Sequence, residues 1–131
     1  MKELVLEPLD TSFAILRYPT QALPNWLITH LQDPPQDDSA RTLLGITTTS
    51  EELSIVCDVT IIPSSLAEVD SVRISQPWRA LKVQGPLDFK LTGILLRIAE
   101  PLADAGISIF AMSTFDTDYV LVNEERLEQA C

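Results

Sequence analysis

Short runs in which apolar residues alternate with polar ones, or in which β-branched residues cluster, predict strands along most of this chain. The predicted strands span residues 3–7, 13–18, 42–49, 53–59, 71–74, 78–85, 107–113 and 119–122. Shorter helices are expected within 22–32, at 63–69 and at 124–130. The segment "DPPQDDSA", 33–40, is a loop because it holds proline, aspartate and serine and no large apolar side chain.

The strongest helical pattern lies between residues 88 and 105. Its apolar residues recur at helical spacing and form one stripe, made of Leu91, Ile94, Leu95, Ile98, Ala99 and Leu102. Asp88 suits the N-cap, and Gly106 suits a left-handed C-cap. Pro101 removes one helix hydrogen bond, so a kink or a restart is expected there.

The order of these elements predicts an α+β fold. Residues 12–75 read β-α-β-β-α-β, and residues 78–131 read β-α-β-β-α without a last strand. Two ferredoxin-like domains, with antiparallel sheets and helices on one face, fit this order. We expect a first domain at 8–76 and a second at 77–131. Residues 2–7 are expected to add the missing strand to the second domain, because an exposed sheet edge promotes aggregation.

The charge narrows the classes of partner. A formal net charge of −10 over 131 residues disfavours nucleic acid and anionic membranes, both of which need clustered lysine and arginine. No apolar run approaches a membrane span, and the N-terminus does not resemble a signal peptide. These features predict a soluble cytoplasmic protein. Cys57 is expected to be a buried thiol, and Cys131 lies at the last position.

The sequence contains no recognisable catalytic motif. His30 is the only histidine, and no set of residues has metal-ligand spacing. A Gly-x-Ser-x-Gly elbow is absent, and nothing supplies an activated nucleophile or a tuned acid–base pair. We therefore expect no catalytic residues, no metal and no cofactor. The threonine-rich run 47–50 is expected to form a hairpin tip.

Residues 78–122 carry a family resemblance. The stretches "LTGIL", "EPLADAGIS" and "STFDTDYVLV" occur in order, and with their spacing they resemble the small tandem ACT-domain proteins that include the animal cytosolic arginine sensors. The first half, through "TTSEELSIVC" at 48–57, is similar more loosely. The resemblance implies a regulatory module that binds a free amino acid at an interface between two ACT domains, and not an enzyme.

The loop and helix start at 84–93, "QGPLDFKLTG", has the chemistry to bind the carboxylate of an amino acid. A helix N-terminus presents free N–H groups and a favourable dipole. Glycines allow a close backbone approach, and a threonine offers a hydroxyl. The candidate ligand-binding residues in this segment are Gly85, Asp88, Thr92, Gly93 and Ile94.

The polar break in "STFDTD" supplies the second group of candidates. Asp118 is the candidate carboxylate for a ligand cation, and Thr114 and Phe115 offer a hydroxyl and an apolar wall. A simple turn is the alternative, and for Asp116 it is the favoured one, because aspartate is common in turns. For Asp118 both interpretations stay open, since the usual Asn-Gly or Asp-Gly turn is missing.

The resemblance also implies that the backbone of Ile107, Ser108 and Ile109 contributes to the site from a different ACT domain. Because this chain has one copy of that segment, a homodimer is expected to complete the site. The arginine sensors carry two such tandem units, and this chain has one and no fused catalytic domain, so its output is expected to pass to a separate partner protein. A ligand-free dimerisation scaffold is the alternative function. The identity of the amino acid stays open, since one carboxylate suits lysine, arginine or any α-ammonium group.

Overall fold

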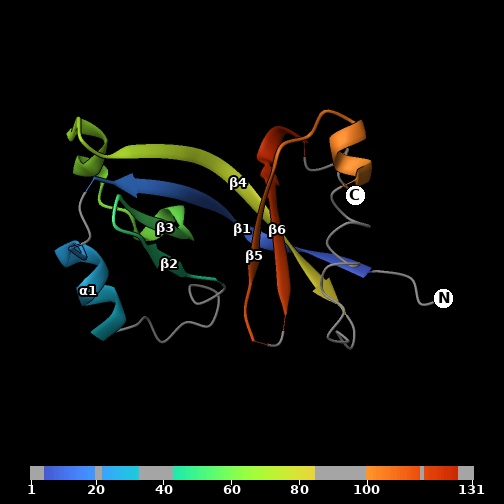
Figure 1. The fold of residues 1–131 in the computed structure, drawn as a ribbon. Coiled ribbons are helices and arrows are strands. Elements are labelled where there is room, and N and C mark those ends of the chain that lie inside the picture. Colours follow the sequence, from blue (N-terminus) through green and yellow to red (C-terminus); the bar gives the residue numbers. More distant parts are fainter. Residues whose placement is uncertain (1–4, 20–21, 33–42, 85–99, 116, 127–131) are drawn as a thin grey trace. The chain divides into compact units, whose positions relative to one another are not determined.

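The computed structural model describes residues 5–19, 22–32, 43–84, 100–115 and 117–126 (Figure 1). The chain divides by its contacts into two compact units. The first unit is Thr11–Pro77, and the second unit combines Met1–Asp10 with Trp78–Cys131. None of the helices in the described part is long and apolar enough to cross a membrane.

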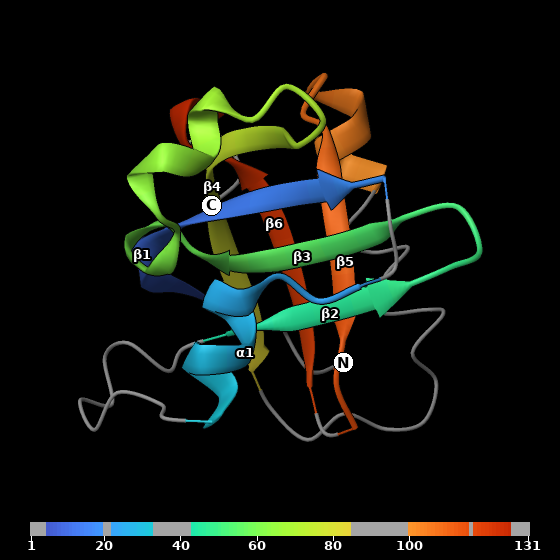
Figure 2. The same cartoon turned by 90° about the vertical axis from the view of Figure 1, so that its left-hand side faces the viewer.

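The first unit is an antiparallel sheet with helical segments on one side. It contains most of β1 (Val5–Tyr18), then α1 (Asn25–Gln32), β2 (Gly45–Thr48), β3 (Leu53–Asp58), the 3₁₀ turns η2 (Val59–Ile61) and η3 (Ser64–Glu68), and the start of β4 (Arg73–Gln84). The strand order is β2-β3-β1-β4, and β3 pairs antiparallel with both β1 and β2 (Figure 2). The predicted hairpin at 42–59 and the helix within 22–32 are confirmed.

The core of the first unit lies on one face of these strands. Ala14 and Leu16 of β1 stand opposite Cys57 and Ile55 of β3, and all four are fully buried. Leu27 of α1 and Leu66 of η3 belong to the same buried cluster. Helical segments therefore pack on the face of β1 and β3 to which these alternate apolar residues point.

The second unit contains the start of β1, most of β4, β5 (Ile109–Ser113), β6 (Asp118–Asn123) and the 3₁₀ turn η4 (Glu124–Arg126). Its strand order is β1-β4-β6-β5, and β6 pairs antiparallel with both β4 and β5. One buried cluster joins β4 and β6 to the helical residues 100–104 and the segment that follows, and comprises Leu81, Val83, Leu102, Ile107, Val120 and Val122. The Arg79 guanidinium also donates from Nη2 to the Leu9 carbonyl at 2.6 Å, which ties β1 to this unit.

Two predicted strand breaks are wrong. Residues 3–7 and 13–18 were expected as separate strands, but β1 runs without interruption through Pro8. Likewise β4 continues through Ser75-Gln76-Pro77, where a break was expected. Proline usually lies at the boundary between two secondary-structure elements. Its fixed φ nevertheless lies in the extended range and it removes only one donor, so a long paired strand tolerates it.

The predicted C-cap at Gly106 is confirmed. Gly106 has a φ of 74°, the Gly106 N–H donates to Ala103 O at 3.0 Å, and the Ile107 N–H donates to Leu102 O at 2.8 Å. This pair of bonds is the Schellman motif, and the contact between Leu102 and Ile107 in the core is its usual hydrophobic companion. The motif ends the helix and turns the chain into the segment that leads to β5. The proposed N-cap Asp88 lies outside the described residues.

Candidate functional site

The hairpin of β5 and β6 is closed by a threonine turn. Ser113 and Asp118 face each other as the last paired residues. Beyond them, the Thr114 N–H donates to Thr117 O at 2.8 Å, and the Thr117 N–H donates to the Thr114 hydroxyl at 3.1 Å. The polar break in the sequence is therefore a turn, held by hydrogen bonds between Thr114 and Thr117.

Asp118 has no exposed surface, which is unusual for an acidic side chain. It lies two and four residues before Val120 and Val122, so its side chain points to the same face of β6 as this apolar core. The Ser113 hydroxyl donates to Oδ1 at 2.5 Å. The other oxygen, Oδ2, is buried and has no hydrogen-bond partner among the described residues.

Thr114 and Phe115 do not offer a free hydroxyl and an apolar wall beside Asp118 within one chain. The Thr114 hydroxyl is engaged in the turn, because it also donates to Thr117 O at 3.2 Å. Phe115 is 99% exposed at the tip of the hairpin. Within one chain, therefore, Phe115 forms no wall of a site around Asp118.

Ile107, Ser108 and Ile109 lie at the opposite end of β5. Ile107 is buried in the core, whereas Ser108 is exposed. Ile107 and Ser108 line a shallow pocket of about 320 Å³ that also involves Gly106, Trp78 and Asn123. Since an extended strand rises roughly 3.3 Å per residue, this pocket and the Ser113–Asp118 pair are about 16 Å apart along β5. The structure brings together Ser113, Thr114 and Asp118, and it does not bring the strand start to them.

The remaining candidates fall outside the described residues. They are Gly85, Asp88, Thr92, Gly93 and Ile94, and the favoured turn residue Asp116 falls there too. Their role in carboxylate binding stays a prediction.

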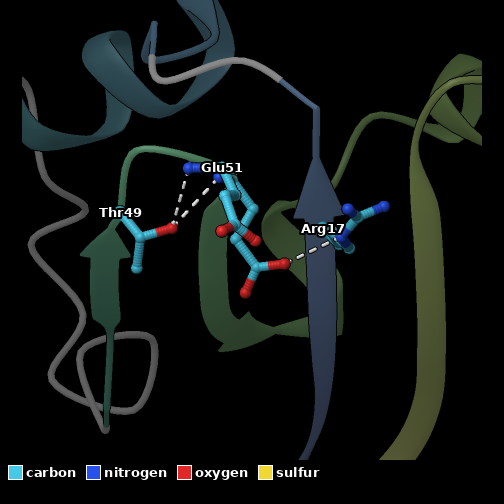
Figure 3. A network of polar contacts seen from close by, with 4 residues as sticks. Arg17, Thr49 and Glu51 are labelled. Carbon is cyan, nitrogen blue, oxygen red and sulfur yellow. Dashed lines mark hydrogen bonds and ion pairs between the residues drawn. The ribbon is translucent and has the colours of Figure 1, made fainter.

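The hairpin of the first unit is built in the same way as the β5–β6 hairpin. Thr48 and Leu53 are its last paired residues. The Thr49 N–H donates to Glu52 O at 2.9 Å, and the Thr49 hydroxyl accepts from the N–H groups of Glu51 and Glu52 at 3.1 and 3.2 Å (Figure 3). Leu53 is fully buried and occupies the position that Asp118 has in the second unit.

Sequence reasoning missed Ser113. The signal was present, because a four-residue turn at 114–117 places Ser113 directly opposite Asp118 in the hairpin. Thr48 holds the same position in the first unit, where its partner is a leucine. A hydroxyl paired with a buried carboxylate therefore occurs in one hairpin and not in the other.

The other reactive side chains among the described residues form neither an activated nucleophile nor a metal site. Burial, together with the charge of neighbouring Asp58, raises the pKa of the Cys57 thiol to about 12. A thiol with that pKa is inert, since the thiolate is the nucleophile. Asp58 is itself satisfied, because its Oδ1 accepts from the backbone N–H and the hydroxyl of Thr60. No group of histidine, cysteine and acidic residues suited to a metal occurs in the part of the chain that the structure describes.

Comparisons with known proteins point to one family. A family model described as an ACT domain matches residues 73–131. The human protein named cytosolic arginine sensor for mTORC1 subunit 1 is 40% identical over 77 residues, which is 56% of this chain and 23% of that protein. The chain thus spans about a quarter of the length of the curated relatives that it matches.

Two solved structures extend the likeness to the whole chain. Protein Atu0741 from Agobacterium tumefaciens is 36% identical, with a TM-score of 0.74, over 99% of this chain and 85% of that one. The regulatory subunit of aspartate kinase from Thermus thermophilus has a TM-score of 0.61 at 11% identity, over 98% of this chain and 93% of that one. At that identity the second likeness shows the fold alone.

Proposed function

Because residues 73–131 match a family model described as an ACT domain, we propose that this chain is a non-catalytic regulatory module that binds a free amino acid through its second unit. The observation that carries this proposal is the buried Asp118 oxygen that has no partner among the described residues. An unpaired polar group in a protein interior costs free energy, and an ammonium or guanidinium group on a ligand would remove that cost.

The proposed site needs two copies of the chain. The strand start at Ile107 and Ser108 is about 16 Å from the Ser113–Asp118 pair, since strands rise roughly 3.3 Å per residue. An amino acid is too short to reach both within one chain. In the proposed homodimer, one copy supplies Asp118 and the helix start at 84–93, and its partner supplies residues 107–109.

The name of the matched relatives suggests which ligand to test first. The matched relatives are named cytosolic arginine sensors, so arginine is the first candidate, and lysine is the second because it also carries a side-chain cation. We propose a cytoplasmic location for the same reason. The bound or empty state would then be communicated to a separate protein.

A thermal-shift scan against all twenty amino acids tests the proposal. A ligand at 100 times its dissociation constant stabilises the fold by roughly 2.7 kcal/mol. Asp118→Asn keeps the shape of the side chain and removes its charge, and it should weaken binding by about 30-fold or more, as expected for breaking a buried charge pair. Asp104→Asn removes one negative charge from an exposed position of the same unit and should leave binding unchanged.

The same samples test the oligomeric state. Light scattering should report twice the 14.5 kDa of one chain when the ligand is present. A selective shift that survives in Asp118→Asn would contradict the role given to Asp118.

The complete burial of Asp118 favours one alternative, a ligand-free dimerisation scaffold. A ligand that reaches Oδ2 must first uncover it, whereas a scaffold has no such requirement. The scaffold predicts a dimer in solution and no thermal shift with any amino acid.

A further inference from the structure

We propose that Ser113 is a positioning residue that fixes the Asp118 carboxylate so that Oδ2 is directed at the ligand cation. This inference rests on the proposed function, in which Asp118 is the ligand's carboxylate partner. Ser113 itself was not among the candidates from the sequence, and in the proposed role it need not touch the ligand.

The contact between the two side chains divides the carboxylate into two different oxygens. Oδ1 accepts from the Ser113 hydroxyl at 2.5 Å, while Oδ2 has no partner among the described residues. A short hydrogen bond to an ionised oxygen is among the stronger and more directional contacts in proteins. Holding Oδ1 in this way fixes the rotation of the carboxylate and therefore the direction of Oδ2.

The position of Ser113 suits this role. Ser113 stands directly across from Asp118 at the last pair of the hairpin. The turn beyond them is held by three hydrogen bonds between Thr114 and Thr117, so the backbones that carry the two side chains are fixed. Serine is exposed here and could be satisfied by water, so the fold does not require its bond to Asp118.

The first unit provides an internal reference. Its hairpin also ends on a hydroxyl residue, Thr48, but the residue opposite is Leu53, which has no oxygen to be oriented. A hydroxyl at this place is therefore compatible with a hairpin that has no carboxylate. Its effect on ligand binding should appear only where it faces an acid.

Two variants of equal shape isolate the hydroxyl. Ser113→Thr keeps it, and Ser113→Val replaces it with a methyl group. With L-arginine as the probe, Ser113→Thr should bind within a few-fold of the wild type, and Ser113→Val should bind about 10-fold or more weakly, as expected for losing a hydrogen bond to a charged group. Thr48→Val is the matched control in the other hairpin and should bind like the wild type.

A second readout does not depend on any ligand. Scalar couplings of the Asp118 β-protons report whether its side chain occupies one rotamer. We expect one rotamer in the wild type and in Ser113→Thr, and averaged couplings in Ser113→Val. Equal arginine affinity in the Thr and Val variants would overturn the inference, and so would weaker binding in Ser113→Val with Asp118 still held in one rotamer.

The two readouts also separate the inference from the proposed function. If the wild type shows no shift with any amino acid, the proposed function fails. The positioning of Asp118 by Ser113 is then supported by couplings that change only in Ser113→Val, and overturned by couplings that do not change.

Discussion

The hairpins β2–β3 and β5–β6 have the same turn and the same register, yet they differ at one buried position. Each closes through a threonine, Thr49 or Thr114, whose hydroxyl accepts from the backbone N–H three residues later. The first buried residue after the turn is Leu53 in one hairpin and Asp118 in the other, and both have no exposed surface. The fold therefore accepts a leucine at this place, and the aspartate is not explained by folding.

This difference separates what stabilises the hairpin from what the site needs. A buried carboxylate oxygen without a partner costs about 1–3 kcal/mol relative to a satisfied one. Leu53 contributes instead to a continuous apolar cluster with Ile55 and Cys57. Exchanging the two residues tests the comparison directly.

The largest effect is expected for Leu53→Asp in the first unit. The variant buries a carboxylate in an apolar cluster that was built around a leucine, so the free energy of unfolding should fall by about 3–5 kcal/mol. Urea denaturation measures this loss. Adding Thr48→Ser to Leu53→Asp recreates the Ser–Asp pair and should recover part of the lost stability. A loss below about 1 kcal/mol in Leu53→Asp alone would show that the two positions are not equivalent in environment.

A smaller effect of opposite sign is expected for Asp118→Leu. Removing a carboxylate whose second oxygen has no partner among the described residues should raise the free energy of unfolding of the ligand-free protein by about 1–3 kcal/mol. The freed Ser113 hydroxyl is exposed and can bond to water. Asp118→Val is the companion variant in case leucine overfills the site, and destabilisation by both would mean that Oδ2 is satisfied in solution.

The smallest effects are expected at the two turns. Thr49→Ala and Thr114→Ala each remove a hydroxyl that accepts from backbone N–H groups, and each should lower the free energy of unfolding by about 1 kcal/mol, as for the loss of a helix cap. The two turns share the bond from the N–H three residues later to the threonine hydroxyl, and each hydroxyl makes one further bond. The two losses should therefore agree within about 0.5 kcal/mol. A clearly larger loss at Thr114 would show that its hydroxyl has a role beyond the turn.

Most helices and strands of the fold could be predicted from the sequence. The two wrong strand breaks have one cause. Alternation predicted the hairpins, and the glycine after the helical pattern predicted the left-handed cap at Gly106. Both wrong breaks lay at prolines, Pro8 and Pro77, in strands that continue through them. Local residue preferences do not include pairing with distant strands, and this pairing decides whether an extended proline stays inside a strand.

The candidate site was predictable only in part. Asp118 was singled out from its place after the polar break, but its full burial and its bond to Ser113 depend on the register of the hairpin and on the core beneath it. Phe115 looked like a wall because it is aromatic, yet the geometry of a short turn directs it into solvent. At this turn the backbone geometry, and not the hydrophobicity of the ring, decides that Phe115 is exposed.

The absence of solvent exposure at Asp118 also has a kinetic consequence. A ligand cannot collide directly with an oxygen that is covered, so a state in which Oδ2 is accessible must form first or a loose encounter must rearrange afterwards. In stopped-flow experiments the observed rate should then level off at high amino-acid concentration instead of rising linearly. The plateau would measure the speed of uncovering, and a response of this protein to its ligand could be no faster than that step.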